Sequence, residues 1–217
     1  MNLKKDIKDA IHDLISYLEY QRSLGVIDIP FSNEIAMTME DIRKRIAGCQ
    51  RCRLYTGRTN IVLGAGKEDA DLLFVGEAPG RDEDIQGRPF VGKAGELLTR
   101  IIEAINLKRE DVYITNIIKC RPPQNRNPEP DEIYACEPFL IEQIQVIKPK
   151  IICALGTFAA RTLLRTDKKI SELRGRFYSY HNIKLMPTYH PAYLLRNPAE
   201  KRDVWKDIQA ISKAVSS

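Results

Sequence analysis

The stretch LLFVGEAPG, residues 72–80, joins a short run of apolar residues to a polar loop that is rich in glycine and proline. Two other apolar runs also end in turns, VYITN at 112–116 and IICALG at 151–156, and IKLMPT at 183–188 forms a fourth. Short runs of branched residues are typical of strands buried on both faces, as in a parallel sheet. Segments with helical spacing lie between and after these runs, at about 93–106, 130–148, 157–166 and 200–215. This alternation predicts an α/β fold with helices on both faces of a parallel sheet.

Three polar loops follow the predicted strands. They begin with GEAPG at 76–80, with IIKCRPPQNRNP at 117–128 and with YHPAYLLRNP at 189–198. Parallel sheets bind their ligands beyond the carboxyl ends of the strands. We therefore expect the three loops to converge on one rim of the sheet and to form the functional site there.

The composition is that of a globular protein, because 43% of the 217 residues are hydrophobic. No run of 18 apolar residues occurs, and the first residues, MNLKKDIKDAIHDL, lack the apolar segment of a secretory signal. We therefore expect a cytoplasmic, nucleoid-associated protein that does not contact a membrane. The net charge of +5 is only a weak indication of an anionic partner, and the basic run at 161–176 is interpreted as a solvated face unless it borders a reactive site.

Residues 1–40 are interpreted as a helical N-terminal extension that precedes a domain over 41–217. Residues 1–22 predict an amphipathic helix, whose apolar positions are Ile7, Ile11, Leu14, Ile15 and Leu18. The segment 24–32 contains Gly and Pro and predicts a linker. Packing of this arm on the domain is the favoured interpretation, since apolar helix faces are usually buried within their own chain. Binding to a protein partner is the alternative.

Four of the five cysteines have the spacing C-x2-C-x67-C-x15-C, formed by Cys49, Cys52, Cys120 and Cys136. Disulfides are disfavoured in a reducing compartment, so metal ligation or burial is expected. The spacing alone favours zinc and a [4Fe–4S] cluster about equally, and four unrelated buried cysteines remain the simplest alternative. Cys153 lies within the predicted strand 151–156 and is expected to be a buried apolar residue.

A few residues at the predicted rim carry chemistry. Among the three histidines, His190 directly follows the strand at 183–188, whereas His12 is expected to be solvated and His181 to lie in a turn. Asn116 ends a predicted strand and offers both a donor and an acceptor, which suits the edge of a pyrimidine. Phe90 could stack on a planar ring. Neither a G-x-S-x-G elbow nor a G-x-x-x-x-G-K-[ST] phosphate loop occurs, so a serine hydrolase or a kinase lacks support.

Taken together, these motifs resemble those of the family 4 uracil-DNA glycosylases. GEAPG at 76–80 and GRPFVG at 87–92 resemble the first motif of that family. TNIIKCRPP at 115–123 is similar to the segment that joins its uracil-reading Asn to a cluster cysteine, and HPAYLLR at 190–196 is similar to its DNA-penetrating loop. The motifs occur in order over roughly residues 41–215, so an accidental match is excluded.

The resemblance implies a three-layer α/β/α sandwich around a four-stranded parallel sheet. It implies an enzyme that flips uracil out of double- or single-stranded DNA and hydrolyses its glycosidic bond in base excision repair. A monomer is expected. It also favours iron over zinc: a structural [4Fe–4S] cluster held by Cys49, Cys52, Cys120 and Cys136.

The same resemblance assigns roles to individual residues. Glu77 and His190 are the expected catalytic residues; those expected to bind uracil are Gly76, Glu77, Phe90, Asn116 and His190. Residues expected to bind DNA are Lys119, Arg121, Arg126, Leu194, Leu195 and Arg196, with Leu194 or Leu195 as the wedge between bases. Some relatives in the wider superfamily have Asp or Asn in place of Glu77, where it activates water. The longer Glu77 side chain, or its backbone carbonyl, is expected to position the attacking water.

Two other classes of protein are compatible with parts of the sequence. A non-enzymatic iron–sulfur or zinc protein that only binds nucleic acid would account for the cysteines and the charge. An electron carrier would account for the cysteines alone. Both would leave GEAPG at 76–80, Asn116 and HPAYLL at 190–195 without a role, so the glycosylase is the favoured hypothesis.

Overall fold

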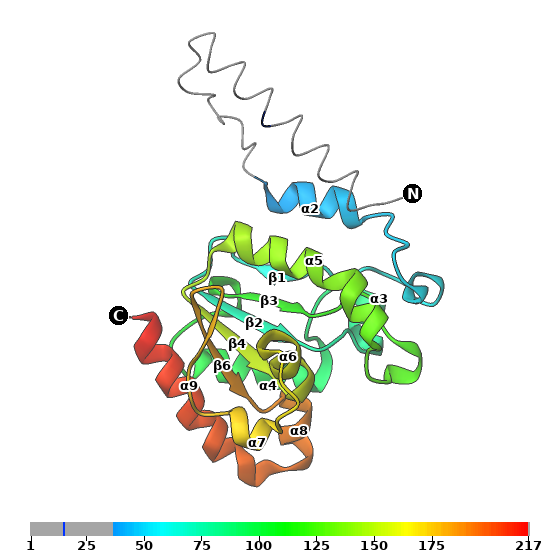
Figure 1. Cartoon of the computed structure of the whole chain (residues 1–217). Coiled ribbons are helices and arrows are strands. Elements are labelled where there is room, and N and C mark those ends of the chain that lie inside the picture. Colours follow the sequence, from blue (N-terminus) through cyan, green and yellow to red (C-terminus); the bar gives the residue numbers. More distant parts are fainter. Residues whose placement is uncertain (1–14, 16–36, 217) are drawn as a thin grey trace, which may run out of the picture. The chain divides into compact units, whose positions relative to one another are not determined.

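Four parallel strands form the centre of a sheet in the part of the chain that the structure describes (Figure 1). The structure is a computed structural model, and it describes Ile15 and residues 37–216. In spatial order, the four strands are β3 (Tyr113–Asn116), β2 (Leu72–Gly76), β4 (Ile151–Leu155) and β6 (Ile183–Thr188). Each agrees with a predicted strand to within one residue, so the predicted parallel sheet is confirmed.

Two short antiparallel strands, which the sequence did not predict, extend this sheet at its edges. β1 (Ala65–Gly66) pairs with β3, and β5 (Tyr178–Tyr180) pairs with β6. Within residues 37–216 the sheet therefore has six strands, in the order β1-β3-β2-β4-β6-β5. His181 and Asn182 connect β5 to β6 with φ values of 46° and 65°, the backbone that a two-residue hairpin turn needs. The predicted turn at His181 is thus confirmed.

The four predicted helices are present. They are α4 (Gly92–Glu103), α5 (Pro130–Ile147), α6 (Thr157–Leu164) and α9 (Lys201–Val215). Shorter α-helices that were not predicted are α2 (Met39–Ile46), α3 (Arg81–Gln86), α7 (Ile170–Leu173) and α8 (Pro191–Arg196). Single turns of 3-10 helix are η1 (Arg53–Thr56), η2 (Arg109–Asp111), η3 (Pro123–Asn125) and η4 (Pro198–Glu200).

Helices lie on both faces of the sheet (Figure 1). Successive residues of each strand point to opposite faces, so the strands contribute to two apolar cores. Val75 and Ile152 belong to one apolar core, which contains buried residues of α2, α5, α6 and α7. Phe74 and Cys153 belong to a second core, with buried residues of α4, α8 and α9. The expected three-layer sandwich is confirmed, and Cys153 is a buried strand residue as predicted.

The chain divides into two units, residues 1–36 and residues 37–217. The predicted helix over 1–22 and the linker over 24–32 fall outside the described residues, except that Ile15 is helical and exposed. The predicted domain boundary at residue 40 therefore stays a prediction. In the described part of the chain, no helix combines the length and the apolar character needed to cross a bilayer.

Candidate active site

The three polar loops that follow β2, β3 and β6 meet around one cavity of about 470 Å³. This agrees with the expectation that they converge on the carboxyl edge of the sheet. The cavity contains Glu77, Phe90, Asn116 and His190, the residues that the sequence singled out. It is also lined by Ala78, Pro79, Gly80, Glu83, Ala94, Pro122, Asn125, Arg126, Asn127, Ala192, Tyr193 and Arg196.

Asn116 lines the cavity at the end of β3, and Gly76 lies beside it at the end of β2. They are register partners at the last positions of β3 and β2, and Asn116 is buried. A Cβ atom on Gly76 would lie 2.4 Å from Asn116 Oδ1 and 2.6 Å from Phe90 Cζ. Glycine is required at this position because the amide and the phenyl ring both approach the backbone there.

Phe90 is held in an unusual backbone conformation. Its φ is 50°, in the left-handed region that non-glycine residues rarely adopt. The Arg109 guanidinium donates hydrogen bonds to the carbonyls of Pro89 and Phe90, at 2.7 and 3.0 Å. Gly95 leaves room for the same loop, since a Cβ there would lie 1.8 Å from the Phe90 carbonyl oxygen. These contacts fix the main chain of the loop that carries the ring.

His190 packs beside Phe90 in the cavity wall, with their ring centroids 5.4 Å apart and their planes tilted by 31°. It is the N-cap residue of α8, and its Nδ1 accepts a hydrogen bond from the Ala192 N–H at 3.1 Å. Burial, with a smaller contribution from the Arg196 charge, lowers the pKa of His190 to about 4. At neutral pH the ring is therefore uncharged, and because Nδ1 is an acceptor, Nε2 carries the proton.

Glu77 lies in the loop after β2. Burial raises the pKa of its carboxyl group to about 7, so both of its protonation states are populated near neutral pH. Its backbone carbonyl accepts a hydrogen bond from the Ile118 N–H at 3.2 Å. The loop after β2 is thereby joined to the loop after β3.

Glu83 connects two of the rim loops and was missed in the sequence. One of its carboxylate oxygens accepts from the Gly80 N–H at 3.1 Å, and the other accepts from the Val91 N–H at 3.0 Å. Its place three residues after Gly80, at the start of α3, is the capping-box position that could have revealed it. The carboxylate therefore fixes the distance between GEAPG and the Phe90 loop.

The prediction that Lys119 binds DNA phosphates is wrong. Its side chain is 0% exposed, and its ammonium donates to Thr115 Oγ1, the Asn116 carbonyl and Gln143 Oε1. Burial lowers the pKa of this ammonium to about 7. A phosphate on the surface cannot reach it.

The two candidates for the wedge also differ. Leu194 is 1% exposed and belongs to the core beneath α8, so it is excluded by its packing. Leu195 is 42% exposed. Two of the arginines predicted to bind DNA, Arg126 and Arg196, line the cavity. Arg196 is exposed, whereas the Arg126 guanidinium donates hydrogen bonds of 2.8 and 2.6 Å to the Glu132 carboxylate. Arg121 is half-buried and donates to Asn125 Oδ1.

The four predicted ligand cysteines lie close enough for the charge on one to raise the pKa of another: Cys49, Cys52, Cys120 and Cys136. All are free thiols, and burial is the main reason that the pKa of Cys136 is raised to about 12. The Lys119 N–H donates to Cys136 Sγ at 3.2 Å, and Arg58 Nη1 donates to Cys120 Sγ at 3.3 Å. Among Ile15 and residues 37–216, no three His, Cys, Asp or Glu side chains are close enough to hold a single metal ion.

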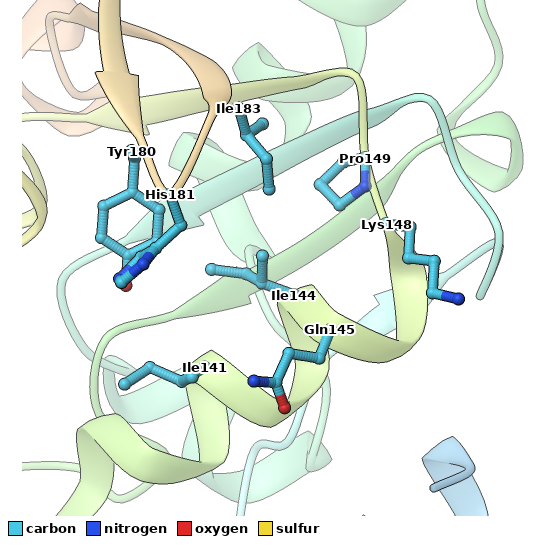
Figure 2. A pocket seen from close by; sticks show the side chains of 8 residues that line it. All are labelled: Ile141, Ile144, Gln145, Lys148, Pro149, Tyr180, His181 and Ile183. Carbon is cyan, nitrogen blue, oxygen red and sulfur yellow. The ribbon is translucent and has the colours of Figure 1, made fainter. Parts of the chain in front are cut away.

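Another cavity, of about 540 Å³, lies between α5 and the β5–β6 hairpin (Figure 2). Ile141 and Ile144 line it from α5, and Tyr180 and His181 line it from the hairpin (Figure 2). His181 packs its ring edge-on against Tyr180, at 4.6 Å between centroids. The histidine here is a packing residue, whereas the reactive groups gather in the cavity at the strand ends.

Comparison with known proteins places these observations in one family. A family model described as the Uracil DNA glycosylase superfamily matches residues 63–209. The chain is 44% identical to a type-4 uracil-DNA glycosylase of Saccharolobus solfataricus, over 85% of this chain and 88% of the relative. It is 46% identical to a type-4 uracil-DNA glycosylase of Thermotoga maritima, over 79% and 91%, and 42% identical to that of Archaeoglobus fulgidus, over 81% and 92%.

Proposed function

The chain belongs to the uracil-DNA glycosylase superfamily, and from this premise we propose how its cavity removes uracil from DNA. The protein is a uracil-DNA glycosylase, an enzyme that hydrolyses the bond between uracil and deoxyribose during DNA repair. The observation that carries the mechanism is the meeting of Asn116, Phe90, His190 and Glu77 in one cavity.

The base must leave the stack before the enzyme can reach its glycosidic bond. Flipped uracil stacks on Phe90, whose main chain is already fixed. Asn116 then accepts a hydrogen bond from N3–H and donates one to O4. Cytosine has the opposite donor and acceptor pattern at these two atoms, so it would leave the buried amide unpaired and is rejected.

His190 stabilises the departing base. As the bond between C1′ and N1 breaks, its electron pair goes to uracil, and negative charge grows on O2. The neutral His190 ring donates its Nε2–H to that oxygen, while its N-cap bond from Ala192 keeps the ring in place. Because the low pKa of His190 keeps the ring neutral, the ring does not have to lose a proton before it donates its Nε2–H to the anion.

Glu77 completes the hydrolysis. Its ionised carboxylate positions a water molecule against the cationic sugar and takes a proton as the water oxygen bonds to C1′. The raised pKa suits this step because the group can both hold and release a proton near neutral pH. The backbone carbonyl of Glu77 is the alternative acceptor for the water.

Four thiolates fit a [4Fe–4S] cluster: those of Cys49, Cys52, Cys120 and Cys136. Thiolates are the preferred ligands of such clusters, and hydrogen bonds to sulfur such as those from Arg58 and the Lys119 N–H stabilise them. When bound, the cluster supplies structural cross-linking of the segments at 49–52, 120 and 136 and no redox step.

DNA binding is assigned to the exposed face around the cavity. Leu195 fills the gap that the flipped nucleotide leaves in the stack, and Arg121, Arg126 and Arg196 contact phosphates. The DNA is double- or single-stranded, the enzyme acts as a monomer, and any protein partner binds the arm over residues 1–40.

The test is incubation of the iron-loaded protein with an oligonucleotide that contains one uracil, followed by alkali to cleave abasic sites. We expect cleavage at the uracil position and none with thymine at that position. His190→Ala serves as the matched control for contaminating enzymes. Binding of the uracil oligonucleotide without any cleavage would instead support the non-enzymatic nucleic-acid-binding protein.

A further inference from the structure

Lys119 occupies a place between the base-reading Asn116 and the cysteines. Its ammonium lies 2.7 Å from Thr115 Oγ1, 2.6 Å from the Asn116 carbonyl oxygen and 2.6 Å from Gln143 Oε1. Its own backbone N–H points to Cys136 Sγ, and Cys120 follows it directly in the chain. One residue therefore touches both the strand end that carries Asn116 and the cysteine site.

The oxygen atoms around the Lys119 side chain belong to a buried hydrogen-bond network. The Thr115 hydroxyl lies 2.7 Å from the Leu63 carbonyl oxygen and 3.3 Å from Gln143 Oε1, and the Gln143 amide N–H donates to the Leu63 carbonyl at 2.9 Å. The Lys119 amino group donates to the oxygens of Thr115 and Gln143 and to the Asn116 carbonyl. It therefore joins the end of β3 to α5.

We propose that Lys119 is a positioning residue for base reading. Its side-chain amino group holds the main-chain carbonyl of Asn116 at the end of β3 and joins it to Gln143 in α5, while its backbone N–H donates to Cys136. The inference rests on the proposed function, because it assumes that Asn116 reads uracil.

The first test is Lys119→Met, a change that keeps the length of the side chain and removes its charge and its donors. We expect single-turnover uracil excision to fall about tenfold. Iron content should stay at the wild-type value, because the backbone N–H that donates to Cys136 is kept. In an Asn116→Ala background the same change should lower excision less than about threefold, because the group that Lys119 positions is already gone.

Lys119→Met also leaves the oxygens of Thr115 and Gln143 unpaired, so it could reduce folding. Lys119→Met combined with Gln143→Leu removes both partners of the hydrogen bond between these side chains. The double variant should therefore be more stable than Lys119→Met alone, because no unpaired Gln143 oxygen stays buried. We expect this double variant to recover most of the lost Tm without recovering the excision rate. Arg58→Met is the matched control, because Arg58 donates to Cys120 without contacting Asn116. It should speed iron loss, and its effect on excision should be the same with and without Asn116→Ala.

Three results would overturn the inference. They are wild-type excision by the Lys119→Met, Gln143→Leu double variant, an equal effect of Lys119→Met in the Asn116→Ala background, and excision by Lys119→Met alone at the wild-type rate. Failure of the proposed function would differ, because Asn116→Ala would then keep full activity.

Discussion

Asn116 and Cys120 are four residues apart in the chain, yet the sites to which they belong are built in different ways. In the base pocket, the protein itself supplies every constraint: Arg109 fixes the Phe90 loop, and the N-cap bond orients His190. At the cysteines, burial raises the pKa values of Cys52, Cys120 and Cys136, which favours their protonated thiol forms. The proposed cluster therefore has to displace these protons to bind. The pocket is preorganised by the fold, whereas the cysteine site is proposed to depend on the cluster.

The largest effect that separates the two sites is expected for Cys136→Ala. The proposed cluster predicts a brown wild-type protein with roughly four irons per chain. The variant should lose both the colour and the iron, and its Tm should fall because a bound cluster contributes folding free energy. Iron analysis, visible absorbance and thermal unfolding measure these losses. Cys153→Ala is the matched control and should keep its iron, since Cys153 lies within β4. Stoichiometric zinc without iron in anaerobically purified protein would contradict the cluster.

Asn116→Ala tests the other half of the comparison. We expect uracil excision to fall at least about a hundredfold, because a lost transition-state hydrogen bond of roughly 3 kcal/mol corresponds to that factor. Iron content should stay at the wild-type value, and binding to duplex DNA should weaken much less, since phosphate contacts supply most of it. Near-full activity in single-turnover assays would show that the base is read elsewhere.

Within the pocket, His190 and Glu77 are expected to act at different moments. His190→Ala should slow bond cleavage strongly, because the ring stabilises charge that appears as uracil leaves. Glu77→Gln should cause a smaller loss, since it acts on a cation that has already formed. A substrate with the better leaving group 5-fluorouracil should partly rescue His190→Ala and should not selectively rescue Glu77→Gln. Single-turnover rates on both substrates decide this, and the reverse pattern of rescue would exchange the two roles.

The smallest expected effect is on stability, and it has opposite signs for the same two residues. The pKa of Glu77 rises from 4.5 to about 7 on folding, so its contribution to stability is full below pH 4.5 and is lost as pH rises to 7. The pKa of His190 falls from 6.5 to about 4, so its contribution is full above pH 6.5 and is lost as pH falls to 4. Between pH 4.5 and 6.5 the two therefore oppose each other.

Denaturant unfolding at several pH values would separate these contributions. The stability of Glu77→Gln relative to wild type should increase from pH 4.5 to 7. That of His190→Ala relative to wild type should decrease from pH 4 to 6.5. Parallel stability curves for the wild type and either variant would contradict the assigned pKa shift of that residue.

The strands could be predicted from sequence because each is a short apolar run buried on both faces, as LLFVG at 72–76 illustrates. β1 was missed because two residues carry no pattern, and β5 was missed because it is an edge strand of three. α3 was missed for a different reason: its sequence RDEDIQ has a charged first turn and no apolar face. Its start is stabilised by Glu83 instead.

For the site, the sequence placed the residues that follow directly from strand ends, such as Asn116 and His190. The prediction for Lys119 was wrong because a lysine in a basic loop resembles a phosphate ligand. Its hydrogen-bond partner Gln143 lies 24 residues away in α5, so no local sequence pattern indicates that Lys119 is buried. Leu194 and Leu195 likewise could not be separated by residue type, since only the direction of the α8 face decides which one is buried.

Cys153 sits in the central strand β4 between β2 and β6, fully shielded from solvent. Its thiol can meet a modifying reagent only when the sheet itself opens, and such openings require the highest free energies in a domain. A thiol reagent that labels five cysteines in denatured protein and fewer in native protein can therefore be used to time unfolding. The rate at which this last cysteine is labelled would report global unfolding directly, in a single experiment and with no probe added to the chain.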